Sequence, residues 1–366
     1  MPDKDHLLFG KLAALERRAR EGDAKAVEKQ HGEKKLTARE RVEQLLDAHS
    51  FVEEFMLAAT QVVDFGMAEK REPGDGVVTG FGKIDGRPVY VFAQDRAVLA
   101  GTVGSAHAEK IAYAIQTARR LGVPLIGLYD SPGARIQEGL TVTAAIGKIF
   151  FENSVTSGAV PQLSAIMGPC IGVASYSPAL TDFIVMVQGS SQMFITGPAV
   201  IKEVLGEQVS MEELGGAKIH SEVSGVADLI AKDDAECLAT LRRLVAFLPS
   251  NFSAAPPRKT PADDAARRVD KMEKIVPEDM RRAYNVTQVI RELADDGDFL
   301  ELKPKFARNL VIGLARLDGY PVGFVANQPM FLAGSLDVDA SDKGARFIRF
   351  CDAFNIPVVT LMDVPG

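Results

Sequence analysis

Residues 77–94, VVTGFGKIDGRPVYVFAQ, decide the fold of this chain because residues 310–327, LVIGLARLDGYPVGFVAN, repeat their pattern. The offset of 233 residues (77 to 310) continues without a gap until Gly133 falls on Gly366, and 18 of the 57 paired positions are identical. The preceding stretch LLDAHSFVEE (45–54) is echoed by LADDGDFLEL (293–302). A repeat of this length predicts two related domains in tandem.

Strand and helix patterns alternate around the first copy of the repeat. A helical pattern with apolar residues at Ala108, Ile111, Ala112 and Ile115 separates two strand patterns. The predicted strands cover residues 87–94, 123–129, 161–167 and 183–187. This order predicts an α/β fold with mixed sheets.

The chain divides into three predicted segments. Residues 1–255 form the first domain, which opens with a helix over 7–20 and a second helix capped by Thr37 and Glu40. Residues 256–272 lack periodicity and are the predicted linker. Residues 273–366 begin the second domain. The first copy runs more than a hundred residues beyond its DSPG turn, so we expect the second domain to be incomplete in this sequence.

Composition excludes several classes of partner. The net charge of −7 and the pI near 5.4 argue against nucleic-acid binding and against an anionic membrane surface. Cys170, Cys237 and Cys351 form neither a disulfide framework nor a metal-binding pair. The apolar stretch 159–187 is broken by prolines and glycines, which predicts buried strands instead of a membrane span. We therefore expect a cytoplasmic protein without a metal in this subunit.

Two turns rich in small residues follow predicted strands. They read DSPGARIQEG (130–139) and GPCIGVASYSP (168–178). Backbone N–H groups released at such turns can converge on one oxygen and stabilise negative charge there, as a thioester enolate requires. Neither turn is a Walker A loop. The alternative is that their glycines only permit close packing.

The histidines offer no catalytic pattern. None of the five has metal-ligand spacing, and His107 is expected at the surface or at the end of a helix. No serine-histidine-aspartate order and no obvious general base stand out. This absence is informative if a cofactor moves the proton.

Longer motifs resemble those of one family. They include KLTARERVEQLLD, GDGVVTGFGKIDGRPVYVFAQD, GPCIGVASYSPALTDFIVMV and KGARFIRFCDAFNIPVVTLMDVPG. The chain resembles the carboxyltransferase (β) subunit of biotin-dependent acyl-CoA carboxylases, of the propionyl-CoA and methylmalonyl-CoA type. The resemblance implies two crotonase-like domains built of ββα units. It implies that acyl-CoA binds the N-terminal domain and that carboxybiotin approaches from the C-terminal domain of a partner subunit.

The resemblance also assigns the charge-stabilising amides. It places the thioester oxygen near Gly172 and Val173, where the family has a Gly-Gly pair. Val173 keeps its N–H group but adds an isopropyl group to the acyl pocket. In the other turn Pro132 replaces a glycine and removes one donor, whereas Gly133 and Ala134 keep theirs.

Further substrate contacts follow from the same resemblance. LAGT (99–102) takes the place of the family's GGS, so Ala100 and Gly101 are expected to line the acyl-CoA site. Arg135, Lys110 and Lys343 are the residues assigned to the CoA phosphates, with solvated surface charge as the alternative for each.

The expected function is transfer of carboxylate between carboxybiotin and the α-carbon of a short-chain acyl-CoA. The expected partners are a biotin carboxylase and a biotin carrier subunit, and self-association as a homohexamer core is expected as well. One alternative is the carboxyltransferase subunit of a sodium-pumping methylmalonyl-CoA decarboxylase, and another is a biotin-independent crotonase-type hydratase or hydrolase. A third is a non-catalytic or truncated assembly subunit. The 366 residues alone are expected to be inactive, because the second turn of the second domain is not in this sequence.

Overall fold

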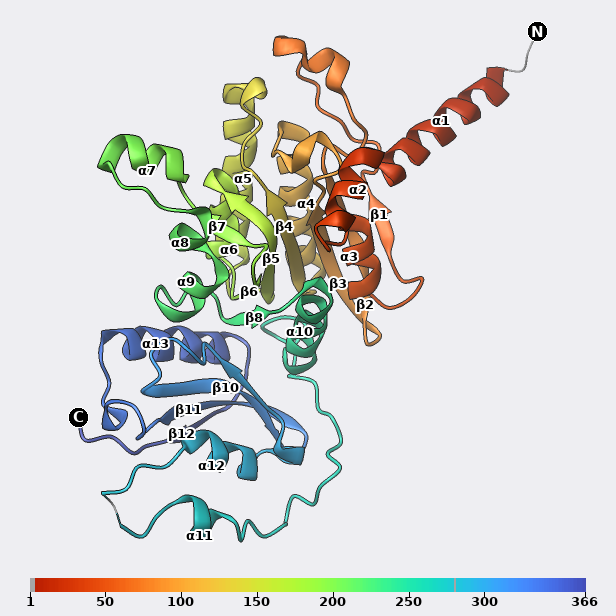
Figure 1. The fold of residues 1–366 in the computed structure, drawn as a ribbon. Helices are drawn as coiled ribbons and strands as arrows, with labels where there is room; N and C mark the ends of the chain where they lie inside the picture. The colour runs from red at the N-terminus through yellow and green to blue at the C-terminus, as the bar shows by residue number, and fades with distance from the viewer. Residues whose placement is uncertain (1–3, 280) are drawn as a thin grey trace. The chain divides into compact units, whose positions relative to one another are not determined.

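The computed structural model describes residues 4–279 and 281–366 (Figure 1). Contacts divide them into two compact units. Unit 1 runs up to Ile219 and includes Ile230–Arg242, and unit 2 contains His220–Leu229 and Arg243–Gly366.

Unit 1 is built on an eight-stranded sheet with the order β1-β2-β3-β4-β5-β6-β8, in which β7 also pairs with β5. The pairs β1–β2 and β2–β3 are antiparallel, whereas β3–β4, β4–β5, β5–β6 and β5–β7 are parallel. The strands are β1 (Val52–Glu54), β2 (Val77–Ile84), β3 (Arg87–Gln94), β4 (Leu125–Ser131), β5 (Gln162–Ile171), β6 (Phe183–Val187), β7 (Gln192–Phe194) and β8 (Leu229–Ala231).

Helices cover this sheet and connect its strands. The two 17-residue helices α4 and α5 pack against each other, and α4 and α3 both pack on β2 and β3. The helices are α1 (Lys4–Glu21), α2 (Ala24–Gly32), α3 (Ala38–Leu45), α4 (Ser105–Leu121), α5 (Leu140–Thr156), α6 (Tyr176–Ala179), α7 (Pro198–Leu205), α8 (Met211–Gly215), α9 (Ala217–Glu222) and α10 (Asp234–Phe247). Short 3₁₀ turns lie at η1 (Asp64–Lys70), η2 (Leu99–Gly101), η3 (Ile136–Glu138) and η4 (Gly172–Ser175).

Unit 2 carries a four-stranded sheet with the order β12-β11-β10-β9. Its strands are β9 (Phe299–Leu302), β10 (Leu310–Leu317), β11 (Tyr320–Asn327) and β12 (Val358–Leu361). Its other elements are α11 (Met272–Ile275), α12 (Val286–Leu293), η5 (Asp295–Gly297), η6 (Leu332–Gly334) and α13 (Val338–Ala353). Helices α12 and α13 lie on the two sides of this sheet (Figure 1).

The sequence repeat recurs as the same strand register in both units. In β2–β3, Val77 pairs with Gln94, and Ile84 pairs with Arg87. In β10–β11, Leu310 pairs with Asn327 and Leu317 with Tyr320, at the corresponding positions. The next parallel pairing repeats as well, with Tyr90–Leu125 matched by Gly323–Val358. An aspartate preceding each hairpin binds the two amides of its turn: Asp47 accepts from Asp85 and Gly86, and Asp295 accepts from Asp318 and Gly319.

Most elements predicted from the pattern are confirmed. The strands over 87–94 and 183–187 have the predicted bounds, and β5 is longer than its prediction because it continues to Ile171. The capping box of Thr37 and Glu40 opens α3. In the described part of the chain, no helix combines the length and the apolar character needed to cross a membrane.

Candidate functional site

Three turns meet at one edge of the unit 1 sheet. They follow β3, β4 and β5, which are neighbouring parallel strands, so their carboxyl ends lie at the same edge. Ser131 at the end of β4 pairs with Cys170 near the end of β5. A Cβ atom added to Gly133 would lie 2.8 Å from the carbonyl oxygen of Ile171, so the turn after β4 packs directly on the turn after β5. The structure thereby places Gly133 against Ile171, the residue that precedes Gly172 and Val173.

The turn after β3 has an unusual backbone. Leu99, Ala100 and Gly101 all have positive φ, at 50°, 54° and 70°. Such a run is rare for residues with a side chain and costs conformational energy. Unit 2 repeats it at residues 332–334. At Gly101 a Cβ atom would lie 2.8 Å from the carbonyl oxygen of Asp130, which places the Ala100–Gly101 turn beside the turn after β4.

The turn after β5 is held by its own side chains. The Ser175 hydroxyl donates to the carbonyl oxygen of Gly172 over 2.7 Å, and the Cys170 thiol donates to that of Ala174 over 3.2 Å. Gly172 has a φ of +60° and begins a 3₁₀ turn, where the first amides have no acceptor within the helix. Val173 lines a small cavity of about 10 Å³, together with Tyr129, Ile149 and other mostly apolar residues.

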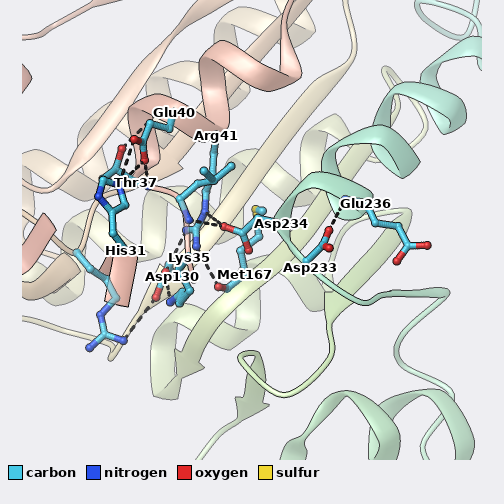
Figure 2. A network of polar contacts seen from close by, with 12 residues as sticks. His31, Lys35, Thr37, Glu40, Arg41, Asp130, Met167, Asp233, Asp234 and Glu236 are labelled. Carbon is cyan, nitrogen blue, oxygen red and sulfur yellow. Dashed lines mark hydrogen bonds and ion pairs between the residues drawn. The ribbon is translucent and has the colours of Figure 1, made fainter. Parts of the chain in front are cut away.

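A buried network of charges supports the turn after β4 (Figure 2). Asp130 Oδ2 accepts from Lys35 Nζ at 2.6 Å and from the Arg41 guanidinium at 3.0 Å. Arg41 also donates to Asp234 at 2.8 Å and to the carbonyl oxygen of Met167 at 3.1 Å. Burial lowers the pKa of Lys35, although Asp130 counteracts it. Burial also opposes the charge of Arg41, but Asp130 and Asp234 outweigh it and raise the pKa of Arg41.

Arg135 belongs to a second buried cluster and does not reach solvent. Its guanidinium donates to Asp75 at 2.6 Å, to Glu138 at 2.8 Å and to the carbonyl oxygen of Thr102 at 2.8 Å. Glu138 in turn accepts from the amide and the hydroxyl of Ser105. These contacts join the turn after β4 to the start of α4. Neither phosphate binding nor solvated surface charge describes Arg135, because its donors are used inside the fold.

His107 is fully buried, so the expected surface position is wrong, whereas the expected helix-end position is confirmed because His107 lies in the first turn of α4. One ring nitrogen lies 3.0 Å from the carbonyl oxygen of Asp75 and the other 3.3 Å from the Gln94 amide. Burial, reinforced by Arg135, lowers the pKa of His107 to about 3. The ring is therefore neutral and donates to Asp75, and Gln94 Oε1 remains free to accept from the amide of Asp130. His107 thus helps to orient Gln94, which binds the turn.

Lys110 and Lys343 occupy equivalent positions of the repeat and make equivalent hydrogen bonds. Lys110 Nζ donates to the carbonyl oxygens of Gly74 and Val77. Lys343 Nζ lies within 3.2 Å of four carbonyl oxygens, including those of the corresponding residues Ala307 and Leu310. Burial lowers the pKa of Lys110 to about 8 and that of Lys343 to about 7. Each ammonium group fastens the loop before a hairpin, so neither is the solvated or phosphate-binding group that was expected.

Sequence reasoning missed the charged residues behind the turns. Lys35, Arg41, Asp75 and Asp130 are buried or nearly so, and all lie in segments that carry the family resemblance. The available signal was a cluster of charges in the stretch KKLTARER (34–41) and a single aspartate in GDGVV (74–78). Their pairing across as many as 193 residues, as between Arg41 and Asp234, could not be read from spacing.

This geometry defines a class of α/β protein whose candidate site consists of backbone turns at the carboxyl edge of a sheet. The carboxyl transferase domain family matches residues 29–366, so the chain belongs to that family. It is 50% identical to the methylmalonyl-CoA decarboxylase subunit alpha of Veillonella parvula, covering 100% of this chain and 71% of the relative. It is 52% identical to the propionyl-CoA carboxylase carboxyltransferase subunit of Haloferax mediterranei, covering 82% of this chain and 58% of the relative.

A solved structure gives the same result. Transcarboxylase 12S, with methylmalonyl-coenzyme A and methylmalonic acid bound, matches with a TM-score of 0.96 and 45% identity, covering 100% of this chain and 72% of that one. The predicted family, the crotonase-like α/β fold and the carboxyltransferase class are confirmed.

Proposed function

We propose that this chain contributes the acyl-CoA half of a carboxyltransferase that acts on short-chain acyl-CoA. In the carboxylation direction the acyl-CoA loses a proton at its α-carbon, and that carbon forms a bond to the carboxyl carbon supplied by carboxybiotin. The carboxyl group leaves biotin, and biotin takes up a proton in its place. The carboxybiotin would be supplied by a carrier partner.

The contact between Gly133 and Ile171 carries this proposal. It supports a site in which the amides of Ala134, in the first turn, and of Gly172 and Val173, in the second, face one thioester oxygen, because the Gly133 amide already donates to the Ser131 hydroxyl. Amides fixed in this way stabilise the charge that develops on the oxygen when the α-proton leaves. The turn at Ala100 and Gly101 would lie beside the acyl-CoA.

The buried charges behind these turns would keep the amides in place. Asp130 heads the Gly133 turn and is anchored by Lys35 and Arg41. Glu138 and Arg135 close the same turn from its other end. A rigid backbone site loses little energy to reorganisation when charge develops on the substrate.

The proposed assembly contains a biotin carboxylase, a biotin carrier subunit and further copies of this chain in the cytoplasm. The relative transcarboxylase 12S forms a hexamer, which supports self-association. Apolar side chains are exposed on unit 1, among them Ile136, Leu140, Val204 and Leu205. Helix α7 buries none of its residues, which is typical of a segment that is covered by a partner.

A second candidate has direct support from the comparisons. Two relatives, from Veillonella parvula and Propionigenium modestum, are alpha subunits of methylmalonyl-CoA decarboxylase and are 50% and 48% identical to this chain. The same site would then remove the carboxylate from methylmalonyl-CoA. A non-catalytic assembly subunit is the third reading.

Two measurements test these readings. Calorimetry should detect binding of propionyl-CoA to the purified protein, and a folded protein without affinity for acyl-CoA would support the assembly reading instead. Pull-down from cells that express the chain should recover a biotinylated protein. Recovery of a biotin carboxylase subunit favours the carboxylase, recovery of membrane subunits favours the decarboxylase, and absence of any biotinylated partner contradicts the proposal.

A further inference from the structure

Arg96 stands beside the candidate site and meets the buried network only at its edge, through a long ion pair with Asp130. It follows β3 by two residues, and its side chain is 31% exposed. Its Cγ atom would lie 3.2 Å from a Cβ atom added to Gly101, so the stem of the side chain packs on the left-handed turn. The guanidinium group therefore starts from a fixed position at the carboxyl edge of the sheet.

The Arg96 guanidinium makes an ion pair but no hydrogen bond with the described residues. Within residues 4–279 and 281–366, its nearest acidic atom is Asp130 Oδ1 at 3.8 Å, which is too long for a hydrogen bond. The structure shows no hydrogen bond from its guanidinium to any described residue. Asp130 Oδ1 is itself buried and has no hydrogen-bond partner among the described residues, because Lys35 and Arg41 both donate to Oδ2.

Neutralising the carboxylates of the buried network does not require the charge of Arg96. Lys35 and Arg41 carry two positive charges and contact the two carboxylates of Asp130 and Asp234. Among the groups joined by these contacts, the charges balance without Arg96. An arginine with free donors near backbone turns is well suited to an anionic oxygen, because the guanidinium group binds carboxylate or phosphate through two parallel hydrogen bonds.

The repeat supports a role for Arg96 outside the scaffold. Asp130 and Lys110 recur in unit 2 as Asp363 and Lys343, at the constant offset of 233 residues (130 to 363). At the same offset Arg96 corresponds to Pro329, which carries no charge. The fold is built in unit 2 without a cation at this position, so the scaffold does not require one.

We infer that Arg96 binds an anionic oxygen of the acyl-CoA, and this inference rests on the proposed function. The oxygen belongs to a phosphate of CoA or to the free carboxylate of a dicarboxylic acyl group, which share the same chemistry toward arginine. Arg96 takes over the anion-binding role that the sequence had assigned to Arg135, Lys110 and Lys343.

The test compares Arg96→Gln and Arg96→Lys with the unaltered protein by calorimetry. The probes are propionyl-CoA, methylmalonyl-CoA and 3′-dephospho-CoA. Arg120→Gln is the matched control, since Arg120 is an exposed arginine at the end of α4, before β4 begins. Thermal unfolding checks that each variant is folded.

Arg96→Gln should weaken binding by about 10- to 100-fold, the effect of losing a hydrogen bond to a charged group, and Arg120→Gln should not. A loss confined to methylmalonyl-CoA identifies the carboxylate. An equal loss of affinity for propionyl-CoA and methylmalonyl-CoA identifies a phosphate of CoA as the ligand of Arg96. If the affinity for 3′-dephospho-CoA falls as well, that phosphate belongs to the pyrophosphate. Arg96→Lys should recover only part of the affinity.

The inference is overturned if Arg96→Gln binds all three probes with affinities within twofold of those of the unaltered protein. That result leaves the proposed function intact. If the unaltered protein binds none of the probes, the proposed function fails and the inference fails with it.

Discussion

Lys35 Nζ lies 2.6 Å from Asp130 Oδ2, and this pair joins residues 95 positions apart in the sequence. Both side chains are buried, with 6% and 0% exposure. Asp130 opens the turn that carries Gly133 and Ala134, and Lys35 belongs to the segment just before α3. The N-terminal segment therefore anchors one of the turns of the candidate site.

Removal of Arg41 should destabilise the protein more than removal of Lys35. Arg41→Met leaves Asp234 without its cation and weakens the support of Asp130, whereas Lys35→Met leaves Asp130 paired with Arg41. Breaking a buried ion pair typically costs about 3–5 kcal/mol, and we expect Arg41→Met to fall in that range. Urea unfolding followed by circular dichroism measures the difference.

Glu109→Gln is the control for this pair of variants. Glu109 pairs with Lys148, and the two side chains are 50% and 58% exposed, so its loss should change stability by less than about 1 kcal/mol. Equal effects of Arg41→Met and Glu109→Gln would contradict a structural role for the network.

Gly168 is required by the same aspartate. A Cβ atom at this position would lie 2.0 Å from Asp130 Oδ1, and Asp130 cannot move without breaking its contacts to Lys35 and Arg41. We expect Gly168→Ala to lower the thermal unfolding midpoint strongly and to weaken acyl-CoA binding. Gly147→Ala is the matched control, since Gly147 lies inside α5 with no atom within 4 Å of the added Cβ. It should stabilise by up to about 1 kcal/mol. Similar midpoints for the two variants would refute the steric argument.

The burial of His107 gives stability a defined pH dependence. Its pKa is about 3 in the fold and near 6.5 in the unfolded chain. Between these values the unfolded state binds the extra proton, so the contribution of His107 is fully present above pH 6.5. It is lost as the pH falls toward 3, at up to about 1.4 kcal/mol per pH unit.

The comparison with His107→Asn isolates this contribution. The variant should be less stable at pH 7.5, because asparagine replaces only one of the two ring contacts, but its stability should fall less steeply between pH 6.5 and 5. Urea midpoints across this range give both slopes. Parallel slopes for the two proteins would rule out a neutral, buried His107.

The sequence was sufficient for the local elements and for the repeat, because both depend on short periodic patterns. Gly133, Ala134, Gly172 and Val173 could be grouped in advance, since turns after neighbouring parallel strands share one edge of the sheet. The resemblance located them more narrowly than periodicity could.

The buried charges were not predictable in the same way. Lys110 and Lys343 occur in helical patterns where lysine is usually solvated, and Arg135 follows a turn where arginine often meets an anion. Their partners are backbone carbonyls or acids from distant segments, such as Asp75 and Leu310. Only the tertiary structure brings these groups together, so composition and spacing gave no sign of burial.

Val173→Gly should widen the choice of acyl group. Val173 lines a small cavity with Tyr129 and Phe150, and its replacement by glycine enlarges the space beside Gly172. We expect the affinity for butyryl-CoA to rise relative to that for propionyl-CoA, at a cost of about 1–3 kcal/mol in stability for the lost packing. Competition binding with the two thioesters measures the ratio. An unchanged ratio would show that the acyl group does not reach Val173.

Gly133→Ala should remove the preference of the protein for a thioester. Gly133 has a φ of +108°, and the added Cβ would lie 2.8 Å from the carbonyl oxygen of Ile171, so the turns after β4 and β5 must separate. Propionyl-CoA has a thioester oxygen that free CoA lacks. Separation of the amides should therefore weaken the binding of propionyl-CoA and leave the affinity for CoA almost unchanged. Loss of one such donor typically lowers the turnover rate by ~10²–10³-fold.

Gly206→Ala controls for the left-handed backbone alone, because Gly206 has a φ of +75° with no atom within 4 Å of an added Cβ. Calorimetry with both ligands on both variants decides the matter: an equal loss for CoA and propionyl-CoA in Gly133→Ala would mean that this turn binds the CoA moiety and not the thioester oxygen.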